Sequence, residues 1–505
     1  MALKLRRMIK TQLERKKALS DSWYTLVAFP HSRSLSKRQQ RAFVIAVGAI
    51  LPALNLYAPA HPTLAQRLLA SLVIVLAAVP TVLWLSGRDR GIPFLPFVAG
   101  IYGVYYALPI FLLEKYARAH YLTEVIPNSY VEQALILSLA GLGVLFIGYY
   151  TFPPRALARV VPKLYLRWED HLSIKLVAGL LGVIGVSTYY LDAIVDPTLV
   201  MQEGVNLLAD LSLISIVILF VLQLVGRLGF FATGFLWVVL VPARVLIGLS
   251  TGATSQGLVV VLLLILTYAT LKHRMPWMAL VAGGIALLSL LPVRAEFRAL
   301  TRGAEAADRS PAEEAVLYVA TARDYLTGQA LPYSEALQVS ISRLAHLMTF
   351  AEVVEATPSR VPFWKGETYY PVLFKPIPRF LYPDKPQENS GQAFGHRYGF
   401  LQPDDLSTSY NLPQLVEFYA NFGVIGVLLG MSVVGVLYRA IQNVFIHPGL
   451  GLGAVVASVY IFTRLLLIES AFSLVFGGLF WALVLLGFVH LLMKAVERLQ
   501  SRRAN

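Results

Sequence analysis

Long apolar runs separated by short polar connections make up most of the chain. A helix needs roughly 20 apolar residues to cross the hydrocarbon core of a bilayer. Twelve runs of about this length predict twelve transmembrane helices, near residues 42–60, 66–86, 94–113, 132–152, 172–192, 207–226, 229–249, 255–272, 277–293, 415–438, 452–469 and 472–493. The pattern therefore predicts an all-α polytopic membrane protein.

The same pattern divides the chain into five parts. We expect a basic cytoplasmic tail, helices 1–9, a large outer loop, helices 10–12 and a short tail, at residues 1–41, 42–293, 294–414, 415–493 and 494–505. Eleven Lys or Arg residues lie in the first 41 positions, and the first long apolar run begins only at Ala42. This spacing does not fit a cleaved signal peptide, in which the apolar run follows a short charged start.

Lys and Arg are concentrated in the N-terminal tail and in every second connection between the predicted helices. The tail before Ala42 is basic, and so are the connections after the second, fourth, sixth, eighth, tenth and twelfth runs. Cytoplasmic loops carry the excess of Lys and Arg in membrane proteins, so both termini are expected in the cytoplasm. Residues 294–414 then lie outside.

The outer loop carries helix signals of its own. Ser310 and Pro311 match an N-cap and a first helical position, and this helix is expected to reach Gly328. A second helix is predicted from Ser334 to Ala356, with apolar residues spaced for one buried face. The segment FKPIPRFLYPDKP at 374–386 is stiffened by four prolines and cannot cross a bilayer as a helix.

Composition narrows the class of protein. Hydrophobic residues make up 57% of the chain and charged residues 14%, against roughly 25% charged residues in soluble domains. The net charge of +14 is concentrated in membrane-flanking positions, so it does not indicate nucleic-acid binding. The absence of cysteine excludes disulfides, thiolate metal sites and a cysteine nucleophile. No HExxH, DxD or P-loop motif occurs, so we expect no metal or other cofactor.

A few ionisable or polar residues interrupt the predicted spans, all towards their outer ends. Such residues are costly in lipid and mark functional sites more often than not. They are Arg244, Arg294, Glu296, Arg298, Glu417, Asn421 and Arg464. The surplus of arginine predicts an anionic ligand such as a diphosphate, whose oxygens the guanidinium fork binds in pairs. The competing interpretation is that each charge reaches the interface or pairs with a neighbour for structural reasons.

Three segments give the chain a resemblance to a known family. They are PVRAEFR at 292–298, GETYYPVLFKPIPRFLYPDKP at 366–386 and NLPQLVEFYANFGVIGVLLGM at 411–431. In their order and spacing the chain resembles the bacterial oligosaccharide repeat-unit polymerases, the O-antigen polymerase (Wzy-type) family.

This resemblance implies a GT-C-like glycosyltransferase of the inner membrane. It would join repeat units carried on undecaprenyl diphosphate into O-antigen, capsule or exopolysaccharide at the periplasmic face. Its partners would be the lipid-linked oligosaccharide, membrane lipids, and a flippase and a chain-length regulator of the same pathway.

The candidate site follows from this chemistry. Leaving-group charge must be stabilised, and the attacking hydroxyl must lose a proton. We assign Glu417 as the base and Arg298 and Arg379 as catalytic cations, with Asp384, His396 and Asp405 in reserve for the base. Expected substrate-binding residues are Arg244, Arg294, Arg343, Asp384, Lys385, His396, Tyr410, Asn421 and Arg464.

Two other functions stay open. An O-antigen ligase uses the same donor and transfers it to a lipid A core. A lipid-linked oligosaccharide flippase is a transporter, and it should line a cavity with charges through the full depth of the membrane.

The distribution of charge predicts the topology. Reporter fusions at Ser310 and Gln387 should behave as periplasmic, and fusions in the 153–171 loop and at both termini as cytoplasmic. A cytoplasmic signal at both Ser310 and Gln387 would exclude a site on the outer face.

Overall fold

The computed structural model describes residues 33–504, apart from 90–91, 119–123, 153–165, 167, 169–171, 195–203, 206, 251–253, 273, 302–310, 328–332, 380, 387, 407 and 446–450. Helices form nearly all of its regular secondary structure, and the described residues contain one isolated bridge, between Ala117 and Val125. The expected all-α class is confirmed. The predicted cap at Ser310 and most of the basic 153–171 loop lie outside the described residues.

Seven helical stretches of the described chain are long and apolar enough to cross a membrane. They belong to α2 (Arg33–Tyr57), α3 (Leu64–Leu85), α6 (Asn128–Thr151), α10 (Leu211–Leu224), the run of α11 (Phe230–Gly234), η1 (Phe235–Leu240) and α12 (Val241–Ser250), α19 (Gln414–Phe445) and α21 (Phe472–Ala504). Shorter apolar helices lie in α4 (Phe94–Tyr106), α8 (Leu172–Ile194), α13 (Thr254–Lys272) and α20 (Leu452–Leu465). These helices are those of a multi-pass membrane protein, and the count of twelve spans stays a prediction.

Three predicted spans differ in shape from the structure: the third, the ninth and the tenth, α19, which is bent. The third is divided into α4 and the short α5 (Pro109–Leu112). The ninth, α14, runs from Trp277 to Thr301, well past its expected end at residue 293. Arg294 and Arg298 therefore lie on a helix and not in the following loop.

The outer loop is folded. Helix α15 (Pro311–Leu326) begins at the proline that the sequence singles out. The second predicted helix is broken at Ala345, whose ψ of 64° is not helical, into α16 (Tyr333–Leu344) and α17 (His346–Ala356). The prediction of one continuous helix was wrong here, and the break buries His346 at the start of α17. After α17 come the 3-10 helix η3 (Glu367–Phe374) and α18 (Ser390–Arg397).

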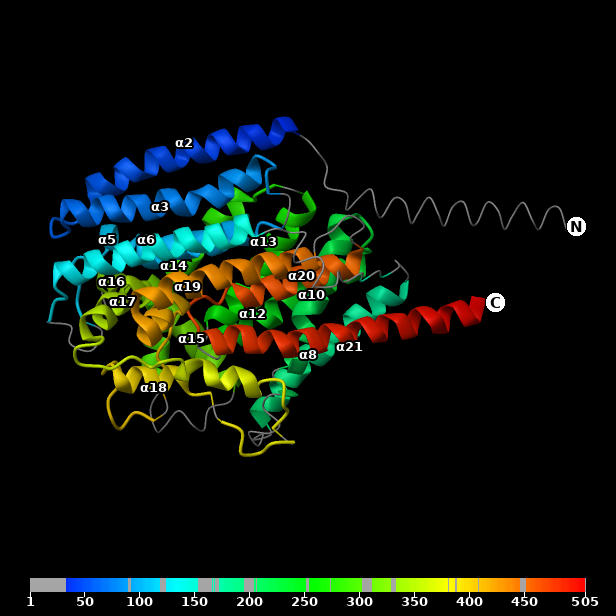
Figure 1. Ribbon diagram of the computed structural model, residues 1–505. Helices are drawn as coiled ribbons and strands as arrows, with labels where there is room; N and C mark the ends of the chain where they lie inside the picture. The colour runs from blue at the N-terminus through cyan, green and yellow to red at the C-terminus, as the bar shows by residue number, and fades with distance from the viewer. Residues whose placement is uncertain are drawn as a thin grey trace, which may run out of the picture.

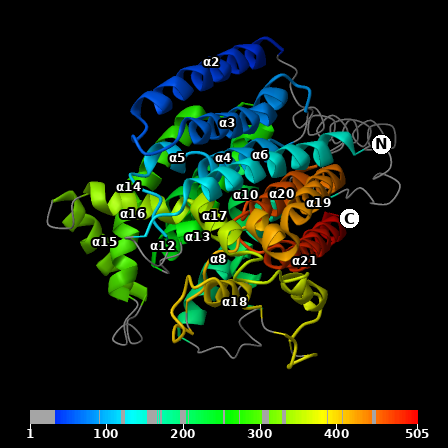
Figure 2. The same ribbon diagram turned by 60° about the vertical axis from the view of Figure 1, so that its left-hand side comes forward.

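These loop helices gather at one end of the bundle. Figure 1 shows α16, α17 and α18 at the end opposite to the C-terminal end of α21. In Figure 2, α15 and α16 stand to one side, while α17 lies against α6 and α19. Helices α16, α17 and α18 and the C-terminal end of α21 therefore lie at opposite ends of the bundle, and the side of the membrane on which each end lies stays a prediction.

Helix α19 is bent sharply near its start. Phe422 and Gly423 have non-helical backbone angles, and the φ of +63° and ψ of −146° at Gly423 are open essentially to glycine alone. We call residues 422–423 the elbow. It divides α19 into a half-helix (residues 414–421) and a long arm (residues 424–445). The prediction of one straight span over 415–438 was wrong, because Phe-Gly does not look like a break within an apolar run.

Glycines let the half-helix fold back onto the long arm. A Cβ at Gly426 would lie 2.1 Å from the carbonyl oxygen of Phe418, and one at Gly430 would lie 2.5 Å from its ring. Further along, a Cβ at Gly435 would lie 2.1 Å from the carbonyl oxygen of Leu145 on α6. Small residues allow such close backbone approach between helices. The long arm is thus packed against α6 and against its own beginning.

Gly426→Ala should therefore destabilise the protein. The new methyl group meets backbone, which cannot move aside, and overpacking of this kind costs about 1–3 kcal/mol. Gly478→Ala is the matched control, since nothing lies within 4 Å of a Cβ there. Thermal unfolding in detergent should show a lower midpoint for Gly426→Ala and an unchanged or higher one for Gly478→Ala. Equal midpoints would mean that the elbow is not tightly packed.

Candidate functional site

Glu417 lies on the half-helix and is fully buried. Its Oε2 accepts a hydrogen bond of 2.6 Å from the backbone N–H of Phe472, the first residue of α21. The first N–H groups of a helix have no partner within the helix, and a carboxylate placed there also meets the positive end of the helix dipole. Glu417 thus caps a helix distant in the sequence. Its other oxygen, Oε1, is buried and accepts no hydrogen bond within the described part of the chain, although the hydroxyl of Thr368 lies close to the carboxylate.

Asn421 is also fully buried, one turn after Glu417. Its Nδ2 donates to the carbonyl oxygen of Glu417 at 2.8 Å and to the hydroxyl of Thr368 at 2.9 Å. Its Oδ1 accepts from the backbone N–H of Gly366 at 2.8 Å. The predicted proximity of Glu417 and Asn421 is present, and Asn421 ties the half-helix to the start of η3.

The C-terminal carbonyl groups of the half-helix are satisfied by the same loop. Trp364 and Lys365 donate their backbone N–H groups to the carbonyl oxygens of Ala420 and Asn421. Lys365 has a φ of +53°, and Gly366 follows with +92°. A lysine in this region is uncommon and marks a position held by its surroundings.

A second carboxylate approaches the same end of α21. Glu388 accepts from the hydroxyl of Ser473 and forms an ion pair with Lys375. Ser473 is fully buried, and Glu388 is largely buried. Two acids of the outer part therefore converge on the first two residues of α21, with Lys375 as a balancing cation.

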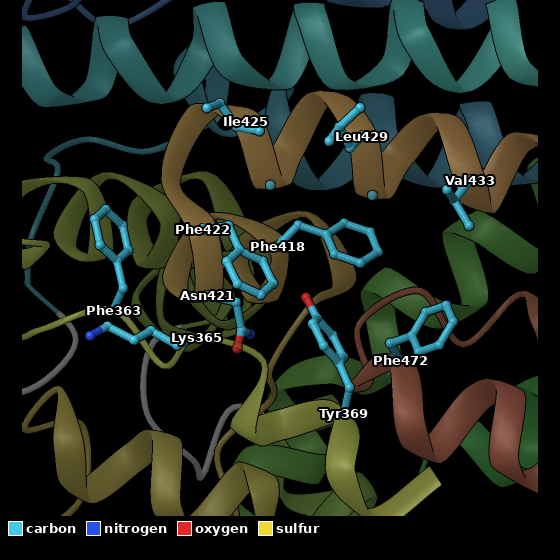
Figure 3. A pocket seen from close by; sticks show the side chains of 12 residues that line it. Phe363, Lys365, Tyr369, Phe418, Asn421, Phe422, Ile425, Leu429, Val433 and Phe472 are labelled. Carbon is cyan, nitrogen blue, oxygen red and sulfur yellow. The ribbon is translucent and has the colours of Figure 1, made fainter. Parts of the chain in front are cut away.

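A cavity of about 720 Å³ lies beside these groups. We call it the α19 groove. It is lined by Phe363, Lys365, Tyr369, Phe418, Asn421, Phe422, Ile425, Gly426, Leu429, Gly430, Val433 and Phe472. Figure 3 shows Ile425, Leu429 and Val433 in succession along the long arm, with Lys365 and Asn421 toward the Ile425 end and Tyr369 near the middle, between Phe418 and Phe472. The groove is thus apolar almost throughout, and Lys365 and Asn421 make its end at the elbow the polar end.

Arg244 and Arg464 meet at a different centre. Arg464 forms an ion pair with Asp210, which precedes α10, and its guanidinium lies 5.6 Å from the ring centroid of Tyr460. The hydroxyl of Tyr460 donates to Asp210 at 2.6 Å, and Arg244 is close enough to Tyr460 for their charges to interact. Asp210, Arg244 and Tyr460 are buried. Neither arginine lines the groove, so for Arg464 the structure provides the pairing role that the sequence left open.

Glu469 is the centre of a third polar cluster, in the turn between α20 and α21. Its carboxylate accepts from the hydroxyl of Tyr105 at 3.3 Å and from Asn411 at 3.2 Å, and Nε2 of His346 lies 3.6 Å away. The backbone of the same turn is bonded to the half-helix, since Gln414 N–H donates to the carbonyl oxygen of Ile468. This cluster connects α4 and α17 to the turn before α21.

The remaining predicted residues are dispersed. Arg379 donates to the carbonyl oxygens of Pro383 and Lys385, and Lys385 donates to that of Ile377, so both brace their own loop. Asp384 and Arg343 are exposed. Arg294 and Arg298 lie on α14, but their side chains are not among those described.

Three predicted residues lie around α18. Tyr410 hydrogen-bonds with Thr349 at 3.1 Å, and burial raises the pKa of Tyr410 to about 12. His396 lies on α18 itself. Asp405 accepts from the backbone N–H of Thr408, which is a local turn contact. None of the three lines the groove.

Several residues of these clusters were not predicted. Asp210, Thr368, Glu388 and Glu469 carry no motif, and each lies next to a turn where polar residues are common. Lys365 had one signal, its place before a glycine in an aromatic stretch. Among the described residues, no group of three or more His, Asp or Glu side chains is placed to hold a metal ion.

Comparison with known proteins provides one match. A family model described as "Domain of unknown function (DUF8712)" matches residues 167–501. No curated protein and no solved structure matches the chain.

The cap predicts a difference between two substitutions at Glu417. Glu417→Ala removes the acceptor of the Phe472 N–H, and loss of a helix cap costs roughly 1–2 kcal/mol. Glu417→Gln retains a carbonyl oxygen in the same place, so its midpoint of thermal unfolding should stay nearer the wild type. Glu367→Ala, at an exposed carboxylate of η3, is the control and should have no effect. Equal losses for Ala and Gln would show that charge, and not the hydrogen bond, matters.

Proposed function

The chain belongs to the DUF8712 family of unknown function, and from the site itself we propose that it is a membrane glycosyltransferase. It joins oligosaccharide units carried on undecaprenyl diphosphate at the outer face of the bacterial inner membrane. The observation that carries this proposal is the α19 groove, which combines a long apolar wall with a polar end next to buried acids.

The groove suits a lipid-linked substrate. From Ile425 to Val433 its wall follows eight residues of helix, which corresponds to roughly 12 Å. Ile425, Leu429 and Val433 are 67%, 64% and 53% exposed, so the groove is open to the side where acyl chains would lie. An isoprenoid chain entering from the membrane would leave its head group at Asn421, Tyr369 and Lys365.

The charged residues near the groove supply only part of the positive charge that a leaving diphosphate needs. Lys365 is a cation at the polar end of the groove, where a diphosphate would lie. Arg294 and Arg298 stay our predicted arginine ligands. Arg244 and Arg464 are engaged around Asp210, and we propose that they stabilise the bundle beside the site.

In this reaction a hydroxyl of one lipid-linked unit attacks the anomeric carbon of the other. The new carbon–oxygen bond forms as the bond to the diphosphate breaks, and the lipid diphosphate leaves with the electron pair. Glu417 takes the hydroxyl proton on Oε1 in our proposal, while Oε2 holds α21. Because Glu417 does not line the groove, the hydroxyl has to approach past Asn421.

The ligase and flippase alternatives use the same lipid-linked oligosaccharide as the polymerase and differ in what they do with it. A ligase would transfer the same donor to a lipid A core. A flippase would transfer no sugar at all. A transfer assay with purified protein and lipid-linked units therefore tests the proposal directly.

Leu429→Trp should weaken the use of the long-chain donor. The indole occupies the middle of the groove, and excluding two methylene groups at about 0.8 kcal/mol each corresponds to roughly a tenfold rise in KM. Leu483→Trp, at an exposed apolar position of α21 that does not line the groove, is the matched control.

Two further measurements define the result. A donor analogue with a short lipid chain should be used equally well by wild type and Leu429→Trp. Glu417→Gln should bind donor but form no polymer. Sugar transfer by wild type to a lipid A core would identify a ligase, and donor translocation without transfer would identify a flippase.

A further inference from the structure

The chain around Lys375 lies alongside the N-terminal part of α21. The side chain of Lys375 packs against Gly477, where an added Cβ would lie 2.5 Å from the Cγ of the lysine. The carbonyl oxygen of Lys375 accepts a hydrogen bond of 2.8 Å from Nε1 of Trp481. Figure 1 shows this part of the chain, in yellow, beside α21, in red. Gly477 and Trp481 both lie within the stretch of α21 that is able to cross a membrane.

The Lys375 side chain runs back towards the start of α21. Its ammonium pairs with Glu388, and Glu388 accepts from Ser473, four residues before Gly477. Four residues correspond to about 6 Å along the helix. The backbone of Lys375 is thus deeper than its charge, which is the posture of a lysine whose stem lies in lipid and whose ammonium reaches the interface.

Much of the described backbone of this segment is satisfied within the protein where it leaves regular structure. Its four prolines have no N–H group to satisfy. The carbonyl oxygens of Lys375, Ile377, Pro383 and Lys385 receive side-chain donors, from Trp481, Lys385 and Arg379. Non-helical backbone is tolerated at membrane depth only when its polar groups are satisfied in this way.

The side chains that this segment exposes between its ends are largely apolar, while the exposed carboxylates of Glu367 and Asp384 lie at its two ends. Tyr370, Leu373, Leu381 and Tyr382 are 54%, 68%, 67% and 40% exposed. On α21 itself, Leu474 and Phe480 are 44% and 40% exposed, so the two apolar surfaces belong to neighbouring parts of the fold. A surface next to a membrane-crossing helix, with its cations turned inwards, fits acyl chains.

We propose that the described residues of 367–385, which leave out residue 380, form a re-entrant segment that enters the outer leaflet beside α21, with Leu373 and its apolar neighbours in contact with lipid acyl chains. The prolines have no N–H group, and Arg379 and Lys385 donate to backbone carbonyl oxygens. Few backbone groups of the segment would therefore face lipid without a partner. The proposal does not depend on the reaction that the protein catalyses.

The chain has no cysteine, so single labels are straightforward. The single-cysteine variants Leu373→Cys and Leu406→Cys are each labelled with an environment-sensitive fluorophore. Each is then reconstituted as full-length protein in phosphatidylcholine vesicles. Leu406 is 78% exposed on the loop after α18 and is the control. Doxyl-labelled phosphatidylcholine should quench the label at 373 several-fold more strongly than that at 406, and iodide in the buffer should do the reverse.

Two outcomes would overturn the proposal. Equal quenching at the two positions would mean that the segment lies in water. Protection of position 373 from both quenchers, with energy transfer between labels on different molecules, would mean that a second copy covers it.

The role of the side-chain donors within the segment can be tested with the same quenching assay. Lys385→Met removes the donor to the Ile377 carbonyl oxygen, and Arg360→Gln removes an exposed cation at the end of α17. Lipid quenching at position 373 should fall to less than half in Lys385→Met and stay unchanged in Arg360→Gln. Unchanged quenching in both would show that depth does not depend on this donor, and would contradict the role assigned to Lys385.

Discussion

The hydrogen bond from Phe472 N–H to Glu417 is the interaction on which the outer half of the bundle depends. It joins the half-helix of α19 to the start of α21 within a buried environment. The elbow turns the half-helix back onto the long arm, and without a partner at α21 this short helix would have little to hold it. Asn421 and the backbone of residues 364–366 then satisfy its C-terminal end. The α19 groove lies among the segments that these contacts hold together, namely the half-helix, the long arm, the chain at 363–369 and the start of α21.

The outer loop is organised around the same point. Glu388 and Lys375 reach the second residue of α21, and Glu469 joins α4 and α17 to the turn before it. Each buried or half-buried charge is thus placed against a helix end or an opposite charge, as expected where desolvation is expensive. In the proline-rich segment, Arg379 and Lys385 are likewise engaged, because they donate to backbone carbonyl oxygens of the segment itself. In the function that we propose, these fixed contacts hold the head group of the substrate in one position while its lipid chain stays in the membrane.

Part of the site could be predicted from single residues. Glu417 and Asn421 were recognisable because a carboxylate and an amide are rare in apolar spans, and they do lie together. Arg464 was recognisable for the same reason, but its partner Asp210 is 254 positions earlier in the chain and precedes a helix, where an acid is unremarkable. Arg379 and Lys385 looked like ligand-binding cations, and the structure uses them to brace their own loop. A charge signals that a partner is needed, and it does not say which partner.

The sequence by itself determined the class of the protein, because the length and spacing of apolar runs follow directly from bilayer thickness. It also determined the position of the large loop and the start of α15 at Pro311, since proline fixes φ and favours the first turn of a helix. Only the tertiary structure decided the elbow at Phe422–Gly423, the break at Ala345 and the groove. Each of these depends on contacts between segments far apart in the chain, such as Phe472 with Glu417, and such contacts leave no local pattern in the sequence.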